Sequence, residues 1–160
     1  MGGMLELLRP LLPPQSRAAL LCVGSELRED DYAGMYLSTL LAKRRVEGLL
    51  VVEGFTAPES CTGPIRDFKP DAVIVFDAAW MGKKPGEYAL LSPQEITGAT
   101  FSTHMLPLPV TLSYLEMTCG CKTAYVGIQP RSIGQGIGMD PAVKAGVERL
   151  ALELGALLEA

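Results

Sequence analysis

The sequence predicts an α/β fold: a three-layer sandwich with a mainly parallel, twisted sheet of about five strands and helices on both of its faces. Short runs of continuously apolar residues, typical of strands buried on both faces, alternate with segments of helical periodicity. This alternation is the pattern of parallel sheets covered by helices. The 160 residues, 48% of them hydrophobic, are enough for one continuous core. We therefore expect a single domain over residues 1–160, with residues 1–17 as an N-terminal extension.

In the first half of the chain, three strands alternate with two helices. The expected segments are, in order, residues 18–23, 32–45, 49–52, 58–68 and 72–76. The first and third strands, residues 18–23 and 72–76, are continuous apolar runs, and Gly24 ends the first of them. The first helix has alanine, tyrosine and leucine side chains recurring on one face. Pro58 opens the second helix, because proline is favoured in a first helical turn.

The second half of the chain continues this alternation. The expected segments are a strand at residues 87–91, a helix at 110–118, a strand at 123–128 and a helix from 141 onward. The turn signal Pro85-Gly86 precedes the first of these. The last helix has the clearest start, since Asp140 is placed to cap it and Pro141 suits its first position. Its apolar residues recur at helical spacing as far as Leu157.

Charge and hydropathy argue against two classes of partner. The chain has 14 Lys and Arg against 18 Asp and Glu, a net charge of −4 with no basic footprint for a nucleic acid. No apolar run approaches the roughly 18 residues that cross a bilayer, so we expect no membrane partner. Glu6, Arg9 and three prolines interrupt the apolar amino terminus, which argues against a signal peptide. We expect a soluble protein of the cytoplasm.

Three other chemical motifs are weak. Cys119 and Cys121 are soft metal ligands, but no second Cys or His pair lies nearby to complete a tetrahedral site. The glycines within residues 134–138 precede a helix start, and we interpret them as a connector because they do not match a phosphate-binding loop. A receiver-type phosphoacceptor domain needs an acidic pair at the end of its first strand and a lysine after its last, and the chain has neither.

Two carboxylates and the single histidine of the chain are the candidate site residues. Ligands of open α/β sheets bind outside the carboxyl ends of the strands. Asp31 follows the first strand and Asp77 ends the third, so both fall at this edge, and His104 lies in a long connection able to fold over it. One nitrogen and two oxygen donors in one cleft suit a borderline metal ion, and a carboxylate there can also activate water.

Each candidate also has an ordinary structural interpretation. Asp31, or its neighbour Asp30, suits the N-cap of the helix that begins at Tyr32. A carboxylate at the end of a buried strand, as at Asp77, needs either a solvated cleft or hydrogen bonds, because an unpaired charge in the core is costly. A lone histidine is often a surface residue or a satisfied core residue.

Several sequence motifs accompany these candidate residues and together cover nearly the whole chain. They are Cys22-Val23-Gly24-Ser25-Glu26-Leu27-Arg28-Glu29-Asp30-Asp31, Ala57-Pro58-Glu59, residues 69–78, Met81-Gly82, Pro85-Gly86, Ser102-Thr103-His104 and Gly127-Ile128-Gln129-Pro130. In these motifs and their spacing, from about residue 20 to 154, the chain resembles the maturation endopeptidases of NiFe hydrogenases. It is most similar to the branch that processes the large subunit of formate-hydrogenlyase-type enzymes.

The resemblance implies a monomeric protease that removes a short C-terminal extension from the large-subunit precursor after nickel insertion. It assigns the metal contacts of the family to Asp31, Asp77 and His104, which would recognise nickel that the substrate already carries. The protein then needs no permanently bound cofactor, and three ligands without a strong fourth suit only weak binding of free nickel, zinc or cadmium. Either Asp31 or Asp77 would act as general base on water, or the metal would polarise the scissile carbonyl.

Ser25, Tyr32 and Thr103 stand beside these residues and are the expected substrate-binding residues. Two of them depart from the family pattern, which has asparagine in place of Ser25 and glycine in place of Tyr32. Serine keeps hydrogen-bonding capacity, whereas tyrosine adds bulk next to Asp31 and does not easily take a positive φ. The tyrosine would reshape the substrate cleft, narrow the specificity or mark a loss of activity. The alternative function is a non-catalytic module that binds the nickel-loaded precursor.

Overall fold

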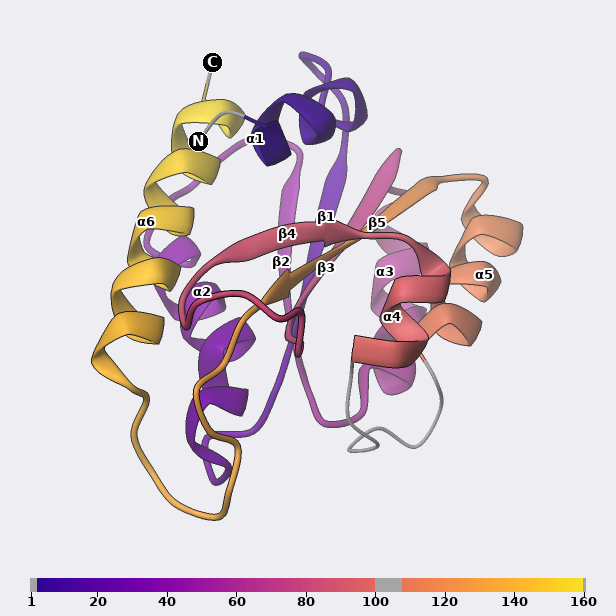
Figure 1. Cartoon of the computed structure of the whole chain (residues 1–160). Helices are drawn as coiled ribbons and strands as arrows, with labels where there is room; N and C mark the ends of the chain where they lie inside the picture. The colour runs from indigo at the N-terminus through magenta and orange to yellow at the C-terminus, as the bar shows by residue number, and fades with distance from the viewer. Residues whose placement is uncertain (1–2, 100–107, 160) are drawn as a thin grey trace.

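The computed structural model describes residues 3–99 and 108–159, which form a five-stranded sheet with helices on both faces (Figure 1). The strands are β1 (Ala18–Val23), β2 (Leu49–Phe55), β3 (Ala72–Ala78), β4 (Tyr88–Leu91) and β5 (Lys122–Ile128). They lie in the order β2-β1-β3-β5-β4, and β4 runs antiparallel to β5 at one edge while the other pairs are parallel. The predicted α/β class and mainly parallel sheet are confirmed.

Helices from the described residues cover both faces of the sheet (Figure 1). One face carries α1 (Gly3–Leu8), α2 (Ala33–Leu41) and α6 (Pro141–Leu158), and the other carries α3 (Thr62–Phe68), α4 (Pro93–Ala99) and α5 (Leu108–Cys119). The longest of them, α6, has 18 residues. Within the described ranges, no helix combines the length and the apolar character that crossing a membrane requires.

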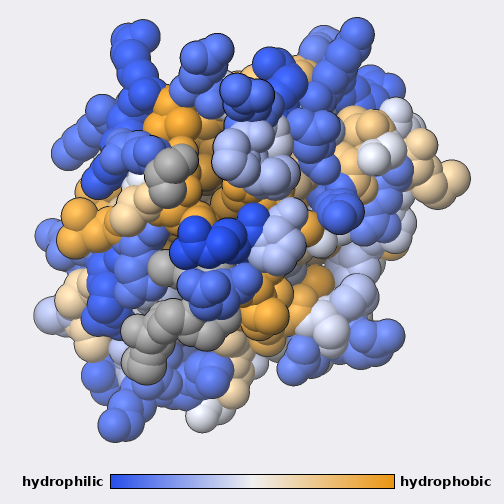
Figure 2. All heavy atoms as spheres, turned by 90° about the horizontal axis from the view of Figure 1, so that it is seen from above, coloured by the Kyte–Doolittle hydropathy of each residue, from blue (hydrophilic) through white to orange (hydrophobic). Residues whose placement is uncertain are grey.

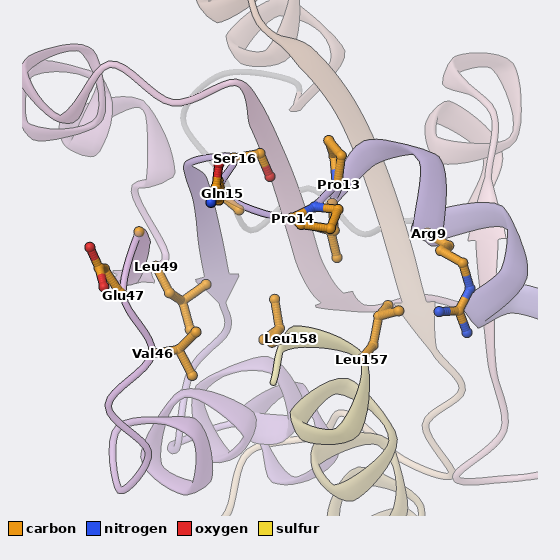
Figure 3. Close-up of a pocket in the computed structure, with 13 residues that line it drawn as sticks. Arg9, Pro13, Pro14, Gln15, Ser16, Val46, Glu47, Leu49, Leu157 and Leu158 are labelled. Atoms are coloured by element: carbon orange, nitrogen blue, oxygen red, sulfur yellow. The ribbon is translucent and has the colours of Figure 1, made fainter. Parts of the chain in front are cut away.

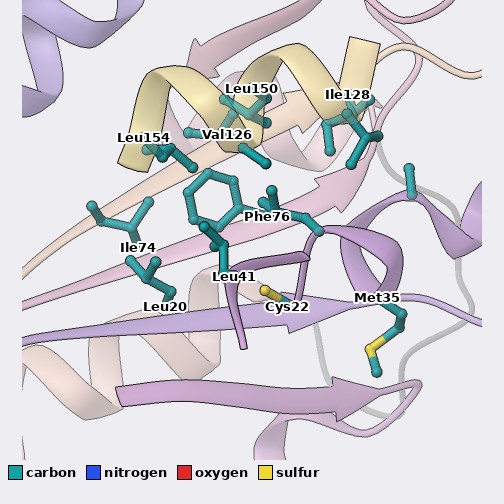
Figure 4. Packing of buried hydrophobic residues seen from close by; sticks show 14 of the residues in the cluster. Leu20, Cys22, Met35, Leu41, Ile74, Phe76, Val126, Ile128, Leu150 and Leu154 are labelled. Atoms are coloured by element: carbon teal, nitrogen blue, oxygen red, sulfur yellow. The ribbon is translucent and has the colours of Figure 1, made fainter. Parts of the chain in front are cut away.

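The two faces of the sheet bury separate apolar clusters. Ile74 and Phe76 of β3 pack toward α2 and α6 in the cluster drawn in Figure 4. Val73 and Val75 of the same strand pack toward α3 and α5. Side chains alternate between the faces along a strand, so Asp77 continues the row of Val73 and Val75. The candidate acid therefore lies on the α3–α5 side, at the carboxyl end of its strand.

The helix predicted at residues 32–45 is too long. A 3₁₀ helix, η2 (Glu29–Tyr32), leads into α2, and α2 ends at Leu41. A longer helix would carry the chain away from the start of β2. Arg44 lies outside the helix instead, where its guanidinium donates a hydrogen bond to Glu159, 2.9 Å away at the end of α6. The basic residues after α2 thus belong to the return loop.

Several other boundaries differ from the prediction. The segment expected as one helix at residues 58–68 is a 3₁₀ helix, η3 (Pro58–Cys61), followed by α3, while β2 and α5 are longer than predicted. The helices α1 and α4 and the 3₁₀ helix η1 (Arg9–Leu11) have no counterpart in the prediction. Leu8 is fully buried in the core, so this part of residues 1–17 packs against the sheet.

The last helix follows its prediction closely. Asp140 is its N-cap and accepts a hydrogen bond from the Ala142 amide at 2.9 Å, and Pro141 occupies the first turn. The apolar positions predicted for the core are all buried, namely Val143, Val147, Leu150, Leu154 and Leu157. The capping residue and the 3.6-residue spacing were enough to define this element.

The start of α2 lies directly on the carboxyl ends of β1 and β3. A Cβ atom at Gly34 would approach the carbonyl oxygen of Val23 to 2.3 Å and that of Phe76 to 2.5 Å. Both distances are far shorter than any Cβ contact allows, so only glycine permits this approach. The contact holds η2, and with it Asp31, against the end of β3.

We expect Gly34→Ala to lower the free energy of unfolding by about 1–3 kcal/mol, because the added methyl group must displace strand backbone. Gly63→Ala is the matched control, since a Cβ there meets only the tip of Arg66 at 3.9 Å. In that open surface position, ahead of Pro64, alanine should stay within about 0.5 kcal/mol of the unmodified protein. Chemical denaturation of both variants measures the effect, and equal stability of the two would contradict the packing described.

Candidate active site

Asp31 and Asp77 meet at the carboxyl edge of the sheet. Asp31 lies in η2 and Asp77 is the penultimate residue of β3, and each is only 1% exposed. Both act on the same phenol, that of Tyr125 in β5. Burial and the negative charges of Asp77 and Asp31 raise the pKa of Tyr125 well above its usual value of 10. The structure therefore brings the two predicted acids together.

Tyr125 holds one oxygen of the Asp77 carboxylate. Its hydroxyl donates a hydrogen bond to Asp77 Oδ2 at 3.1 Å, within the buried layer under α3 and α5. Asp77 lies opposite Gly127 and Tyr125 lies opposite Val75, so the two side chains are diagonal neighbours on one face of the sheet. Tyr125 is not among the site residues predicted from the sequence. A tyrosine two residues before Gly127, in a strand beside β3, was the available signal.

A tight turn after β1 presents Asp31. Gly24 has φ of 151°, and a Cβ there would lie 2.0 Å from the carbonyl oxygen of Asp31. The Ser25 amide donates a hydrogen bond to the same oxygen at 3.2 Å. Glycine at position 24 is thus required for the turn to close on itself, and closure directs η2 across the end of the sheet.

Asp30 has a structural role that differs from the predicted helix cap. Its Oδ2 accepts hydrogen bonds from the amides of Arg131 and Ser132 at 2.8 and 3.0 Å, and its Oδ1 accepts one from the Asp140 amide at 2.7 Å. The N-cap of α2 is Tyr32, which makes no side-chain cap hydrogen bond. A carboxylate with three amide donors is well compensated for burial. Asp30 therefore fastens η2 to the loop between β5 and α6.

Two hollows flank the turn that carries Asp31. One, of about 310 Å³, is lined by Gly24, Ser25, Glu26, Leu27, Tyr32, Met35, Glu53, Phe55 and Thr56. The other, of about 660 Å³, is lined by Ser25, Leu27, Arg28, Ile133, Gly134 and Gln135. Ser25 borders both and Tyr32 borders the first. The structure thus places both of these predicted substrate-binding residues in surface hollows next to the acids.

A further cavity of about 610 Å³ lies at the opposite edge of the sheet (Figure 3). Its walls include Pro13 and Pro14 before β1, and Leu157 and Leu158 at the end of α6. Figure 2 shows the molecule from this side, with apolar side chains gathered between hydrophilic ones. Ligand sites of parallel sheets lie at the carboxyl ends of the strands. This cavity is therefore remote from the candidate active site.

The cysteine pair also lies away from the acids. Cys119 ends α5 and Cys121 precedes β5, at the amino end of that strand. Burial raises the pKa of the Cys121 thiol to about 11, and burial also raises the pKa of the fully buried Cys22. Neither thiol is therefore ionised near neutral pH, and a thiolate nucleophile needs the opposite shift.

His104 and Thr103 lie outside the described residues. The segment 100–107 joins α4 to α5, and both of these helices cover the face on which Asp77 lies. Within residues 3–99 and 108–159, no group of three or more His, Cys, Asp or Glu side chains is placed to hold a metal ion. The assignment of His104 as the third metal contact thus stays a prediction.

A parallel sheet with two buried acids at its carboxyl edge, beside hollows open to the surface, is the arrangement expected of an α/β enzyme. A family model described as HycI, hydrogenase maturation protease, matches residues 35–155 of the chain. The chain belongs to this family of hydrogenase maturation proteases and is therefore an endopeptidase. The predicted family resemblance is confirmed.

Relatives and solved structures agree with this assignment. The hydrogenase 3 maturation protease of Escherichia coli (strain K12) is 33% identical over 130 residues, which are 81% of this chain and 83% of that protein. The crystal structure of HycI, a NiFe hydrogenase maturation protease from Thermococcus kodakarensis KOD1, gives a TM-score of 0.86 at 30% identity over 96% of this chain and 99% of that one. The solution structure of the endopeptidase HycI from Escherichia coli gives 0.76 at 31% identity over 85% and 87%.

We expect Asp30→Asn to lower the free energy of unfolding by about 1–3 kcal/mol. Asparagine has one acceptor oxygen, and its amide would face one of the three N–H donors that Asp30 now satisfies. Asp67→Asn, on the exposed side of α3, is the control and should stay within about 0.5 kcal/mol of the unmodified protein. Urea denaturation compares the two, and an unchanged Asp30→Asn midpoint would refute the fastening role.

Proposed function

We propose that this protease removes a C-terminal extension from the precursor of a NiFe hydrogenase large subunit after nickel has entered that precursor. The observation that carries the proposal is the buried pair of Asp31 and Asp77 at the sheet edge, in a chain of the hydrogenase maturation protease family. Buried acids at the ligand-binding edge of a sheet, beside a surface hollow, are candidates for catalysis because the burial of a charge is costly.

The two acids and His104 are proposed to contact the nickel ion that the precursor carries. Oxygen and nitrogen donors suit nickel, and three protein contacts leave coordination positions for ligands from the substrate. No permanently bound cofactor belongs to this proposal, and free nickel, zinc or cadmium would bind only weakly. Tyr125 supports the assignment of Asp77, because ligating carboxylates are themselves hydrogen-bonded.

Peptide hydrolysis at this edge needs an activated water molecule. Asp31 or Asp77 accepts a proton as the water oxygen attacks the scissile carbonyl carbon, and the C–N bond then breaks as the leaving amine takes up a proton. The nickel ion of the substrate offers a second route to the same step by polarising the carbonyl. Ser25, Tyr32 and Thr103 are proposed to bind the polypeptide on either side of that bond.

The proposal also covers partner, assembly and compartment. The partner is the large-subunit precursor, and neither a nucleic acid nor a membrane takes part. The net charge of −4 supports the first exclusion, because nucleic-acid binding requires a basic surface. We place the protein in the cytoplasm as a monomer that meets its precursor transiently.

The test is to incubate the protein with nickel-loaded and nickel-free precursor and to follow precursor mass. We expect loss of a C-terminal peptide from the loaded form alone. Asp31→Asn, Asp77→Asn and His104→Ala should each slow processing by about 100-fold or more while the protein stays folded. Asp67→Asn serves as the control and should process normally.

Two outcomes would count against the proposal. Stable complex formation with no change in mass would identify a non-catalytic module for the loaded precursor. Normal processing by His104→Ala would remove that residue from the site while leaving the two acids in place.

A further inference from the structure

Phe55 occupies a backbone conformation that disfavours its own side chain. Its φ is 50°, in the left-handed region, which Cβ-bearing residues avoid and glycine enters freely. The ring is also 58% exposed, so core packing does not explain the conformation. A strained, exposed aromatic residue that persists in a fold motivates a functional hypothesis.

The strained residue lies at the carboxyl edge of the sheet. Phe55 is the last residue of β2, where the pairing with β1 shifts so that Val23 lies opposite Phe55 directly after Cys22 lies opposite Glu53. The Phe55 carbonyl oxygen accepts a hydrogen bond from the Gly24 amide at 2.8 Å. The same turn carries Asp31, so the position of Phe55 is tied to the candidate active site.

Phe55 lines the hollow of about 310 Å³ described above. Met35, which is nearly buried, and Tyr32 give it apolar surface, and the 63% exposed Leu27 stands on its border. Two exposed acidic residues, Glu26 and Glu53, also line this hollow. Its volume is at the small end of the roughly 300–1,000 Å³ of ligand pockets, which suits a single side chain.

We propose that this hollow receives one apolar side chain of the precursor polypeptide close to the scissile bond, and that Phe55 is the specificity-determining residue of its wall. The inference rests on the proposed function, because it takes the precursor as the occupant. Continuity supports this choice, since Ser25 and Tyr32 of the hollow flank the turn that presents Asp31. Glu26 and Glu53 disfavour an acidic side chain at this position.

The test uses a substitution with opposite effects on stability and on binding. Phe55→Gly relieves the left-handed strain and should raise Tm by roughly 2–4 °C. It also removes the ring from the hollow, so we expect KM for the nickel-loaded precursor to rise about tenfold while kcat stays within twofold. Phe55→Ala removes the ring but keeps the strain, and it should raise KM equally without raising Tm.

Lys69→Gly is the matched control. Lys69 also has a left-handed φ, 56°, at the end of α3, and it does not line the hollow. In this variant we expect a similar increase in Tm and an unchanged KM. An unchanged KM in both Phe55 variants would overturn the proposal. A rise in KM in Lys69→Gly as well would also overturn it, because the effect would then come from the backbone and not from the ring of Phe55.

A second measurement identifies the occupant. Each residue within five positions of the bond cleaved in the precursor is replaced by alanine, and processing is measured with the unmodified enzyme and with Phe55→Gly. At one apolar position of the precursor, alanine should slow processing by the unmodified enzyme about tenfold. The same alanine should not slow processing by Phe55→Gly any further. Coupling at no position would overturn the inference. Failure of the unmodified enzyme to shorten any loaded precursor would instead overturn the proposed function.

Discussion

The close approach of helix backbone to strand ends is the constraint on which the rest of the site depends. Gly34 brings the start of α2 onto β1 and β3, and Gly24 lets the turn after β1 close on the carbonyl of Asp31. With larger residues at either position, η2 would stand away from the sheet. Asp31 would then lie apart from Asp77, although the sheet and its core could remain intact. Two glycines thus convert an ordinary parallel sheet into one with paired acids.

Independent neighbours hold each acid at this edge. The hydroxyl of Tyr125, from the adjacent strand, fixes Asp77 by a hydrogen bond. Asp31 is fixed through its neighbour Asp30, whose carboxylate accepts hydrogen bonds from three backbone amides between β5 and α6. Sites whose charged groups are held before the substrate arrives avoid the cost of organising them during the reaction. The burial of Asp30 therefore helps to position Asp31, although the Asp30 carboxylate itself bonds to the loop before α6.

The sequence was informative where a local pattern decides the structure. The apolar run of β1, the buried row of β3 and the capped start of α6 were predicted because each is written in consecutive or periodic residues. The predicted edge position of Asp31 and Asp77 followed from topology alone. Tyr125 was missed because its partnership with Asp77 depends on strand order and register. Phe55 was missed because no local signal marks a left-handed phenylalanine, and Arg44 because its partner is 115 residues away.

On the proposed function, two buried carboxylates at one edge of the sheet also give a physical reason for the protease to act on a loaded precursor. Like charges at close range raise the energy of a site, and burial removes the water that would screen them. A divalent cation carried by the precursor would relieve such repulsion, whereas a precursor without the cation would leave it in place. On the proposed function, the same two side chains would then provide the metal contact and the general base for hydrolysis. On the proposed function, discrimination between loaded and empty precursor arises from the electrostatics of Asp31 and Asp77, without a separate sensing element.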